Sequence, residues 1–423
     1  MDKKLLNVEV DIELDGATFH VGTLASSRGG VRFSYAQEWL ASDRYFPLQP
    51  NIDGPGIFYP EEGRALHQCF SDTGPDRWGR SLLLRAVKRG LLDLNCVSEY
   101  TNTQELRYIL MVSDKLRTGA LRYRNAAGQY FTQTQEGVPQ LIRLADLCGS
   151  ARDLSIEQET ESDLKNLLAP GSSLGGARPK AGIADKGKLY IAKFSKPNDG
   201  WNVPLWEYVN LRMAKDAGLR VPEFRLEKFV ANGVKTTALL AARFDRANTY
   251  DTQRRIPFLS SLSMLGAGEM ERRGYMDIAE AIERYSDDST SDLRELWRRM
   301  VFNILITNTD DHLRNHGFLR TASGWRLSPL YDLESSPESE ISAREWCTGI
   351  EDGQDRYNTI EKAIKTAQLF RLSNDQIAEA LDSMRRVVGR FDKYAKNAGA
   401  ANKEIEFMSS AYRNRDMEYL QSH

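Results

Sequence analysis

The sequence predicts an α+β N-terminal part followed by an all-α C-terminal domain. Apolar residues alternate with polar ones over 6–14, and the Asp15-Gly16 pair that follows is typical of a β-hairpin turn. Short strand patterns and helix patterns then alternate as far as residue 244. Beyond about residue 250, apolar residues recur at helical spacing, as they do over 293–304. A chain of 423 residues has room for two or three domains, and we expect them at 1–125, 126–248 and 249–423.

Each part has its own elements. In 1–125, strands reach about residue 33, and a helical region over 62–92 is interrupted by Thr73-Gly74-Pro75. In 126–248 we expect a helix over 157–168. Strands over 189–194 and 237–244 then flank a helix over 205–217.

Two helices are expected near the C-terminus. Ser373-Asn374-Asp375 has the composition of a helix N-cap, and apolar residues continue at helical spacing to Phe391. A last helix is expected over about 403–420.

Composition limits the class of protein. The 57 Lys and Arg residues nearly balance the 59 Asp and Glu residues, which removes the strongly basic footprint of a simple nucleic-acid-binding protein. No apolar run approaches the roughly 18 residues of a membrane span, and the N-terminus does not resemble a signal peptide. The four scattered cysteines have no CxxC pair and indicate reduced thiols. We therefore expect a cytoplasmic protein with no membrane partner.

The most informative stretch follows the apolar helix over 293–304. Asp310 and Asn315 have the D-x-x-x-x-N spacing of a kinase catalytic loop, in which the aspartate accepts the nucleophile's proton and the asparagine binds Mg²⁺. Asp332 lies seventeen residues beyond Asn315 and has the place of a second Mg²⁺ ligand. Taken singly, Asp310 is also typical of a helix or turn cap, Asp332 of a turn, and His312 of a structural histidine.

A small-residue loop lies upstream, over 172–180. Backbone N–H groups approach a phosphate only where side chains are small, although the same composition is typical of a surface turn. Lys193 ends an apolar strand, as a phosphate-binding lysine does, or is an edge lysine with an exposed tip. Glu207, on the next predicted helix, is either its ion-pair partner or a solvated surface residue. These features occur in the order in which a kinase carries them, and together they indicate phosphoryl transfer.

At this point the sequence resembles the HipA family, the serine/threonine-kinase toxins of bacterial toxin–antitoxin pairs. Four segments carry most of the resemblance, and Pro75-Asp76-Arg77-Trp78-Gly79-Arg80 resembles the family's PDxWG element. The four segments are 172–180, Arg243-Phe244-Asp245-Arg246, 308–315 and Pro329-Leu330-Tyr331-Asp332.

The resemblance implies a two-lobed, kinase-like architecture related to that of phosphoinositide kinases, and it implies ATP and Mg²⁺ as cofactors. Asp310 would be the catalytic residue, and Asn315 and Asp332 the metal ligands. Ser173 matches the loop serine that family members autophosphorylate, with Ser172 as a second candidate. The implied nucleotide-binding residues are Gly175, Gly176, Ala177, Arg178, Pro179, Lys180, Lys193, Ala242, Arg243, Phe244, His312, Asn315, Tyr331 and Asp332, with Ala242 to Phe244 as the adenine hinge.

The resemblance also implies partners. They are a helix-turn-helix antitoxin of the HipB type, operator DNA reached mainly through the antitoxin, and a protein substrate such as an aminoacyl-tRNA synthetase.

Three other functions stay open at this point. A small-molecule kinase would be favoured by an acidic acceptor pocket in the helical domain. A non-catalytic, antitoxin-binding co-repressor would have no need of the complete residue set. A metal phosphohydrolase built on Asp311 and His312 would require more histidines than the five present.

Overall fold

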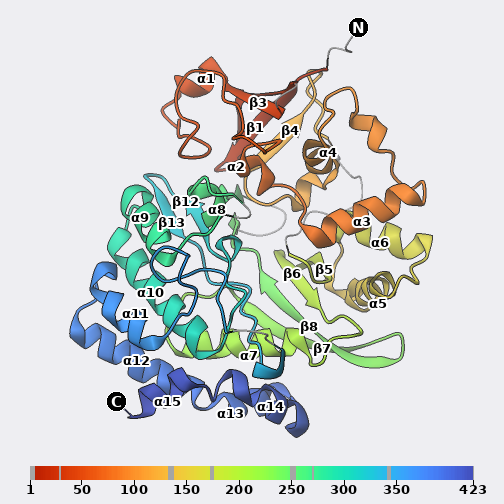
Figure 1. The fold of residues 1–423 in the computed structure, drawn as a ribbon. Helices are drawn as coiled ribbons and strands as arrows, with labels where there is room; N and C mark the ends of the chain where they lie inside the picture. Colours follow the sequence, from red (N-terminus) through yellow and green to blue (C-terminus); the bar gives the residue numbers. More distant parts are fainter. Residues whose placement is uncertain are drawn as a thin grey trace. The chain divides into compact units, whose positions relative to one another are not determined.

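A computed structural model describes residues 5–27, 30–131, 138–171, 176–247, 254–268, 271–340 and 344–422. The chain forms two compact units (Figure 1). Unit 1 contains 1–198, 228–236 and 240–259, and unit 2 contains 199–227, 237–239 and 260–423. The predicted boundaries near residues 125 and 248 stay predictions.

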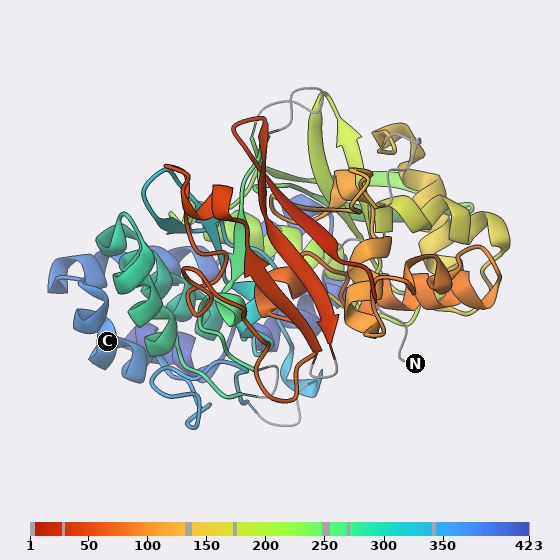
Figure 2. The same ribbon diagram turned by 90° about the horizontal axis from the view of Figure 1, so that it is seen from above.

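Unit 1 begins with an antiparallel sheet of strand order β3-β2-β1-β4. The predicted hairpin is confirmed, because Leu14 pairs with Ala17 and the turn residues Asp15 and Gly16 both have positive φ, at 52° and 81°. The long, twisted β1–β2 hairpin is clear in Figure 2. The strands are β1 (Val8–Leu14), β2 (Ala17–Ser27), β3 (Gly30–Tyr35) and β4 (Leu121–Arg124).

Helices follow this sheet in unit 1. The predicted interruption at residues 73–75 is confirmed, since α2 ends at Ser71 and α3 begins at Arg77. The helix expected over 157–168 is α6, which runs through Pro170 to Gly171. The helices are α1 (Gln37–Leu40), α2 (Gln68–Ser71), α3 (Arg77–Lys88), α4 (Gln104–Met111), α5 (Leu144–Ser155) and α6 (Glu161–Gly171).

A second sheet has the order β5-β6-β8-β7. It contains the strands expected over 189–194 and 237–244, and α7 (Val203–Asp216) is the helix expected between them. The strands are β5 (Lys180–Asp185), β6 (Lys188–Phe194), β7 (Phe224–Ala231) and β8 (Val234–Ala242), followed by the short pair β9 (Arg246–Ala247) and β10 (Arg254–Arg255).

Unit 2 is mainly helical and is built around α10. The apolar stripe predicted from the sequence is fully buried at Leu293, Leu296 and Met300. Besides α7, the helices are α8 (Ser261–Met264), α9 (Tyr275–Tyr285), α10 (Ser289–Leu305), α11 (Ile360–Thr366), α12 (Asn374–Val388), α13 (Phe391–Ala398), α14 (Asn402–Met408) and α15 (Arg415–Ser422).

Two details of the C-terminal prediction need correction. The region is not purely helical, because β11 (Phe258–Ser260), β12 (Gly317–Arg320) and β13 (Trp325–Leu327) form a small sheet whose strands are too short to show alternation. The last helix is split into α14 and α15, because the Asn414 side chain accepts hydrogen bonds from the Asp416 and Met417 amides and starts a new helix.

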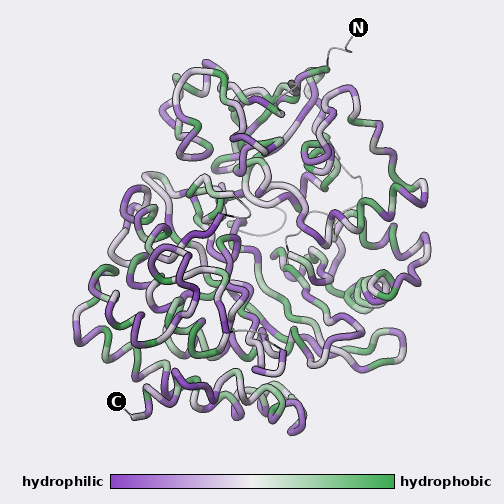
Figure 3. Tube along the Cα trace, in the orientation of Figure 1, coloured by the Kyte–Doolittle hydropathy of each residue, from purple (hydrophilic) through white to green (hydrophobic). Residues whose placement is uncertain are grey.

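Local signals elsewhere are confirmed. Ser373 forms a capping box with Gln376 at the start of α12, as its composition predicts. None of the described helices combines the length and apolar character needed to cross a membrane, and hydrophilic residues interrupt the apolar ones along them (Figure 3).

Candidate functional site

The predicted catalytic aspartate lies in the loop after α10. Asp310 is exposed, whereas its neighbour Asp311 is buried. Of these two adjacent aspartates, only Asp310 is accessible to a substrate. His312 is also exposed, and its amide donates a hydrogen bond to the Asp310 carbonyl at 2.9 Å.

Buried Asp311 holds the Asp310 loop in place through its contacts with the core of unit 2. Its carboxylate pairs with His316 Nε2 at 3.0 Å and accepts a hydrogen bond from the Tyr275 hydroxyl. Thr348 Oγ1 donates to its carbonyl at 2.6 Å. Burial alone would raise the pKa of Asp311, but His316 and the Tyr275 hydrogen bond bring it below its usual value. The carboxylate is therefore held ionised under the loop.

Two contacts fix the backbone and the side chain of Asp310. Asn315 Nδ2 donates to the Asp310 carbonyl at 3.0 Å, which leaves Asn315 Oδ1 as an oxygen of the kind that binds Mg²⁺. The Cys347 thiol lies 3.5 Å from Asp310 Oδ1. Burial, followed by this nearby carboxylate, raises the pKa of Cys347 to about 11, so the thiol stays protonated.

The structure brings the two segments that carry the predicted metal ligands together. Tyr331, next to Asp332, donates its hydroxyl proton to the carbonyl of Arg314, next to Asn315, at 2.6 Å. Asp332 has a φ of +56°, a left-handed conformation that is uncommon outside glycine and concentrated at functional sites.

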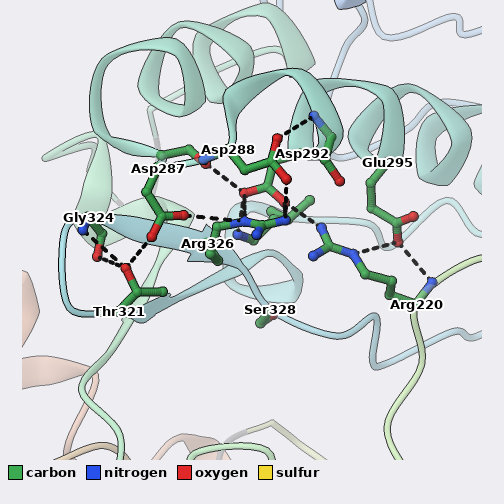
Figure 4. Close-up of polar contacts among 12 residues, drawn as sticks. Arg220, Asp287, Asp288, Asp292, Glu295, Thr321, Gly324, Arg326 and Ser328 are labelled. Carbon is green, nitrogen blue, oxygen red and sulfur yellow. Dashed lines mark hydrogen bonds and ion pairs between the residues drawn. The ribbon is translucent and has the colours of Figure 1, made fainter.

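A network of charged side chains holds the segment that leads to Asp332 (Figure 4). Asp292 on α10 accepts hydrogen bonds from Arg220 at 2.5 Å and from Arg326 at 3.0 Å, and from the Leu327 amide at 3.0 Å. Burial would raise the pKa of Asp292, but these bonds lower it overall. The network keeps β13 on α10 and so fixes where the segment ending in Asp332 begins.

Backbone groups close the remaining turn before Asp332. The fully buried Arg299 donates to the Ser328 carbonyl at 2.6 Å, and the Leu330 amide donates to the Arg220 carbonyl at 2.8 Å. No sequence pattern predicts these contacts.

The predicted phosphate-binding residues lie in unit 1. Lys180 and Lys193 are directly opposite one another across β5 and β6. Cross-strand partners project from the same face of a sheet, so two ammonium groups lie on one face here. The arrangement therefore suits a polyphosphate.

Gly176 makes space for one of these lysines. It has a φ of +86°, and a Cβ atom built on it would lie 2.4 Å from Lys180 Nζ. The positive φ favours glycine here, and any side chain at this position would require the Lys180 ammonium group to move.

The PDxWG element supports the same loop. Asp76 accepts a hydrogen bond from the Gly176 amide at 2.6 Å. The Trp78 amide donates to the Gly176 carbonyl at 3.1 Å, and the Trp78 indole donates to the Lys180 carbonyl at 3.1 Å. The sequence identifies Asp76 and Trp78 only as family markers, and the structure gives them a positioning role.

The rest of the predicted phosphate loop is described only in part. Ser172, Ser173 and Gly175 lie outside the described residues. Ala177 and Arg178 lie between Gly176 and Pro179, whose carbonyl accepts a hydrogen bond from the Phe194 amide at 3.0 Å. Their contacts with a nucleotide stay predictions.

The predicted adenine hinge, Ala242 to Phe244, includes a structural arginine. The Arg243 guanidinium is buried and bonds to Asp245 at 2.6 Å and to the Leu116 carbonyl at 2.6 Å. Asp245 also pairs with Arg246 at 2.7 Å. The Arg243 side chain therefore holds the predicted hinge in place and is not available to a base, whereas Ala242 and Phe244 are partly exposed. Their contact with a base stays a prediction.

Glu207 is 3% exposed, which excludes the solvated alternative for this residue. It belongs to unit 2 and Lys193 to unit 1, and their pairing stays a prediction.

The described residues fit ATP and Mg²⁺ chemically. The lysine pair and the glycine cradle suit phosphates, while Asn315 and Asp332 supply hard oxygen ligands. Fold and site residues together are those of a kinase-like protein.

Residues 172–397, more than half of the chain, match the HipA-like C-terminal domain. The chain belongs to the HipA family. A putative kinase of Haemophilus influenzae is 29% identical over 207 residues, which cover 45% of this chain and 60% of that protein. The serine/threonine-protein kinase toxin HipA of Shewanella oneidensis is 26% identical over 212 residues, which cover 43% of this chain and 47% of that protein. The matches thus span about half the length of these relatives.

A solved structure supports the fold. HipA of Shewanella oneidensis MR-1, in a complex with HipB and its operator DNA, aligns with a TM-score of 0.67 at 17% identity. The alignment covers 98% of this chain and 97% of that one. This likeness confirms the kinase-like HipA fold.

Proposed function

We propose that this chain is an ATP- and Mg²⁺-dependent protein serine/threonine kinase of the HipA toxin type. The Tyr331–Arg314 hydrogen bond carries the proposal most directly. It joins the segment of Asn315 to the segment of Asp332, and the Asn315 amide holds the backbone of the exposed Asp310. A catalytic carboxylate and two metal-ligand segments in one bonded arrangement are what phosphoryl transfer needs.

The proposed reaction uses the chain's own groups as follows. The substrate hydroxyl oxygen attacks the γ-phosphorus, its proton passes to Asp310, and the bond to the β-phosphate oxygen breaks to release ADP. Lys180 and Lys193 bind the phosphates. Mg²⁺, held by Asn315 and Asp332, would neutralise phosphate charge.

Intact-mass spectrometry of the purified chain before and after addition of ATP and Mg²⁺ tests the proposal. We expect added phosphate in the wild type and none in Asp310→Asn. Since Asp310 is exposed, the variant should keep its fold, which circular dichroism checks. A folded Asp310→Asn protein that still acquires phosphate would refute the assignment.

Peptide mapping of residues 165–185 extends the same experiment. We propose Ser173 as the autophosphorylated residue, with Ser172 as the second candidate. A phosphate there would add negative charge beside the phosphate loop and oppose ATP binding. Phosphate confined to other peptides would reject both serines.

The partners follow from the family. The similar Shewanella structure contains HipB and operator DNA, and we propose that this chain likewise binds a small helix-turn-helix antitoxin and reaches DNA mainly through it. We propose a protein substrate such as an aminoacyl-tRNA synthetase. Co-purification with the product of a neighbouring gene, and γ-phosphate transfer to purified synthetases, test the two proposals separately.

One observation favours a second candidate function. A pocket of about 520 Å³ in unit 2 is lined by five carboxylates and two arginines. Two of the carboxylates, Glu351 and Asp352, follow closely after Cys347 and Thr348, which contact the catalytic loop. This is the acidic pocket that a small-molecule kinase with a cationic acceptor would need.

Internal pairing reduces the charge of this pocket, since Arg273 pairs with Asp277 and Arg371 with Glu283. We therefore prefer the protein-kinase proposal to the small-molecule-kinase one. A thermal-shift screen of aminated, hydroxylated compounds, followed by assays of ADP release, separates the two candidates. Turnover of such a compound in the absence of protein substrate would support the second.

A further inference from the structure

A basic pocket lies between α7 and α13 in unit 2, with a volume of about 410 Å³. One face of each helix lines it. On α7, Tyr208 and Arg212 are four residues apart and project from the same side. On α13, Lys393 and Asn397 are likewise four apart, and Arg390 precedes them by one turn. A volume of this size is within the range of small-ligand sites.

The positive charges in this pocket are only partly offset by the protein. Among the described residues, Arg212, Arg390 and Lys393 form no ion pair. The carboxylate that lines the pocket, Asp216, accepts a hydrogen bond from the Tyr394 hydroxyl at 2.8 Å. Burial and this bond raise the pKa of Tyr394 to about 12, so Tyr394 remains a neutral donor. Three cations thus face the pocket against one carboxylate.

Aromatic and amide groups complete the lining. The Tyr208 ring is held edge-on by Phe224, with ring centroids 5.6 Å apart, and Tyr394 supplies a second ring. Asn397 adds an amide that both donates and accepts hydrogen bonds. Aromatic rings beside cationic side chains suit a planar base that carries phosphate.

We propose that this pocket binds an organic phosphate of nucleotide size. The three cations would bind the phosphate, and the tyrosine rings would lie against the base. The pocket is formed wholly by unit 2 and contains none of the predicted ATP-site residues. The proposal therefore does not depend on the chain being a kinase.

Isothermal titration calorimetry of the full chain with AMP tests the proposal, and inorganic phosphate is the second probe. The test variant is Arg212→Glu with Lys393→Glu. The control is Lys215→Glu with Lys396→Glu, which makes the same charge change on the same two helices outside the pocket lining. All four side chains are exposed, so both variants should fold, and circular dichroism checks this. If the double test variant does not fold, the single variant Lys393→Met, which only removes one charge, is measured in its place.

We expect the wild type and the control to bind AMP alike, and the test variant to bind at least about tenfold more weakly, as the loss of charged phosphate contacts requires. AMP binding at the predicted ATP site would be retained by both variants and would not mimic this loss. Equal affinity in all three proteins would overturn the proposal, and so would an equal loss in test and control. Absence of wild-type binding with a Kd of about 1 mM or below would overturn it as well. Tighter binding of AMP than of inorganic phosphate would identify a nucleotide as the ligand, whereas equal binding would restrict the site to the phosphate group.

Discussion

The Asp310 loop of unit 2 and the Gly176 loop of unit 1 are built by different means. Around Asp310, buried charged and polar side chains hold the loop, with Asp311 bonded to both His316 and Tyr275. Around Gly176, backbone amides and carbonyls take most of the hydrogen bonds, and a glycine without a side chain makes room for Lys180. We infer that the Asp310 loop is the more costly to disturb, because removing a hydrogen-bond partner leaves the buried Asp311 carboxylate poorly compensated.

The largest effect is expected for His316→Phe. The substitution leaves the Asp311 carboxylate buried without its imidazole partner, and we expect the free energy of unfolding to fall by about 3–5 kcal/mol. Urea denaturation measures the change. His312→Phe is the matched control, because His312 is exposed and should change stability by no more than about 0.5 kcal/mol. Equal losses in the two variants would contradict the anchoring role of Asp311.

Acid should remove part of the same stabilisation. Because the folded-state pKa of Asp311 is lowered, its ionised form stabilises the fold at pH values above the unfolded-state pKa of about 3.9. This stability is lost as the pH falls through the lowered folded-state value. Asp311→Asn has no such titration, so the difference in unfolding free energy between wild type and variant should shrink from pH 6 to pH 3. A constant difference over this range would mean that the charge of Asp311 is not what anchors the loop.

The sequence predicts features that depend on neighbouring residues, and it does not predict contacts between distant ones. Local signals are confirmed where neighbouring residues carry them, as at the Asp15-Gly16 turn and the Ser373 cap. Spacing alone predicted Asp310, Asn315 and Asp332 as site residues, and in the structure Tyr331 joins the segments of Asn315 and Asp332. Their catalytic and metal-binding roles stay predictions.

The supporting contacts could not be predicted, because they link distant parts of the chain. Tyr275 is 36 residues from Asp311, and Arg220 is 72 residues from Asp292. Neither pair leaves a periodic or compositional trace. The role of Asp76 was missed for the same reason, since Gly176 lies 100 residues away.

A smaller and more selective effect is expected for Gly176→Ala. The new Cβ would displace the Lys180 ammonium group and strain a backbone with φ of +86°. We expect the KM for ATP to rise about tenfold, or roughly 1.4 kcal/mol, with a smaller change in kcat. Gly233→Ala is the matched control, because Gly233 has a φ of +75° and no atom lies within 4 Å of the position that its new Cβ would take. If the control raised KM equally, backbone strain and not the lysine would be responsible.

The smallest effect is expected for Asp76, which supports the loop through one hydrogen bond. Asp76→Ala leaves the Gly176 amide without its acceptor, so the loop should sample other conformations and the KM for ATP should rise by a few-fold, or about 1 kcal/mol. Asp76→Asn retains a carbonyl oxygen at the same place and should restore most of the affinity. Steady-state kinetics against ATP, with urea denaturation of both variants, separates positioning from stability. If asparagine restores KM at unchanged stability, Asp76, at the start of α3, positions the phosphate loop through this hydrogen bond. Equal defects in both variants would show instead that the loop requires the negative charge of Asp76.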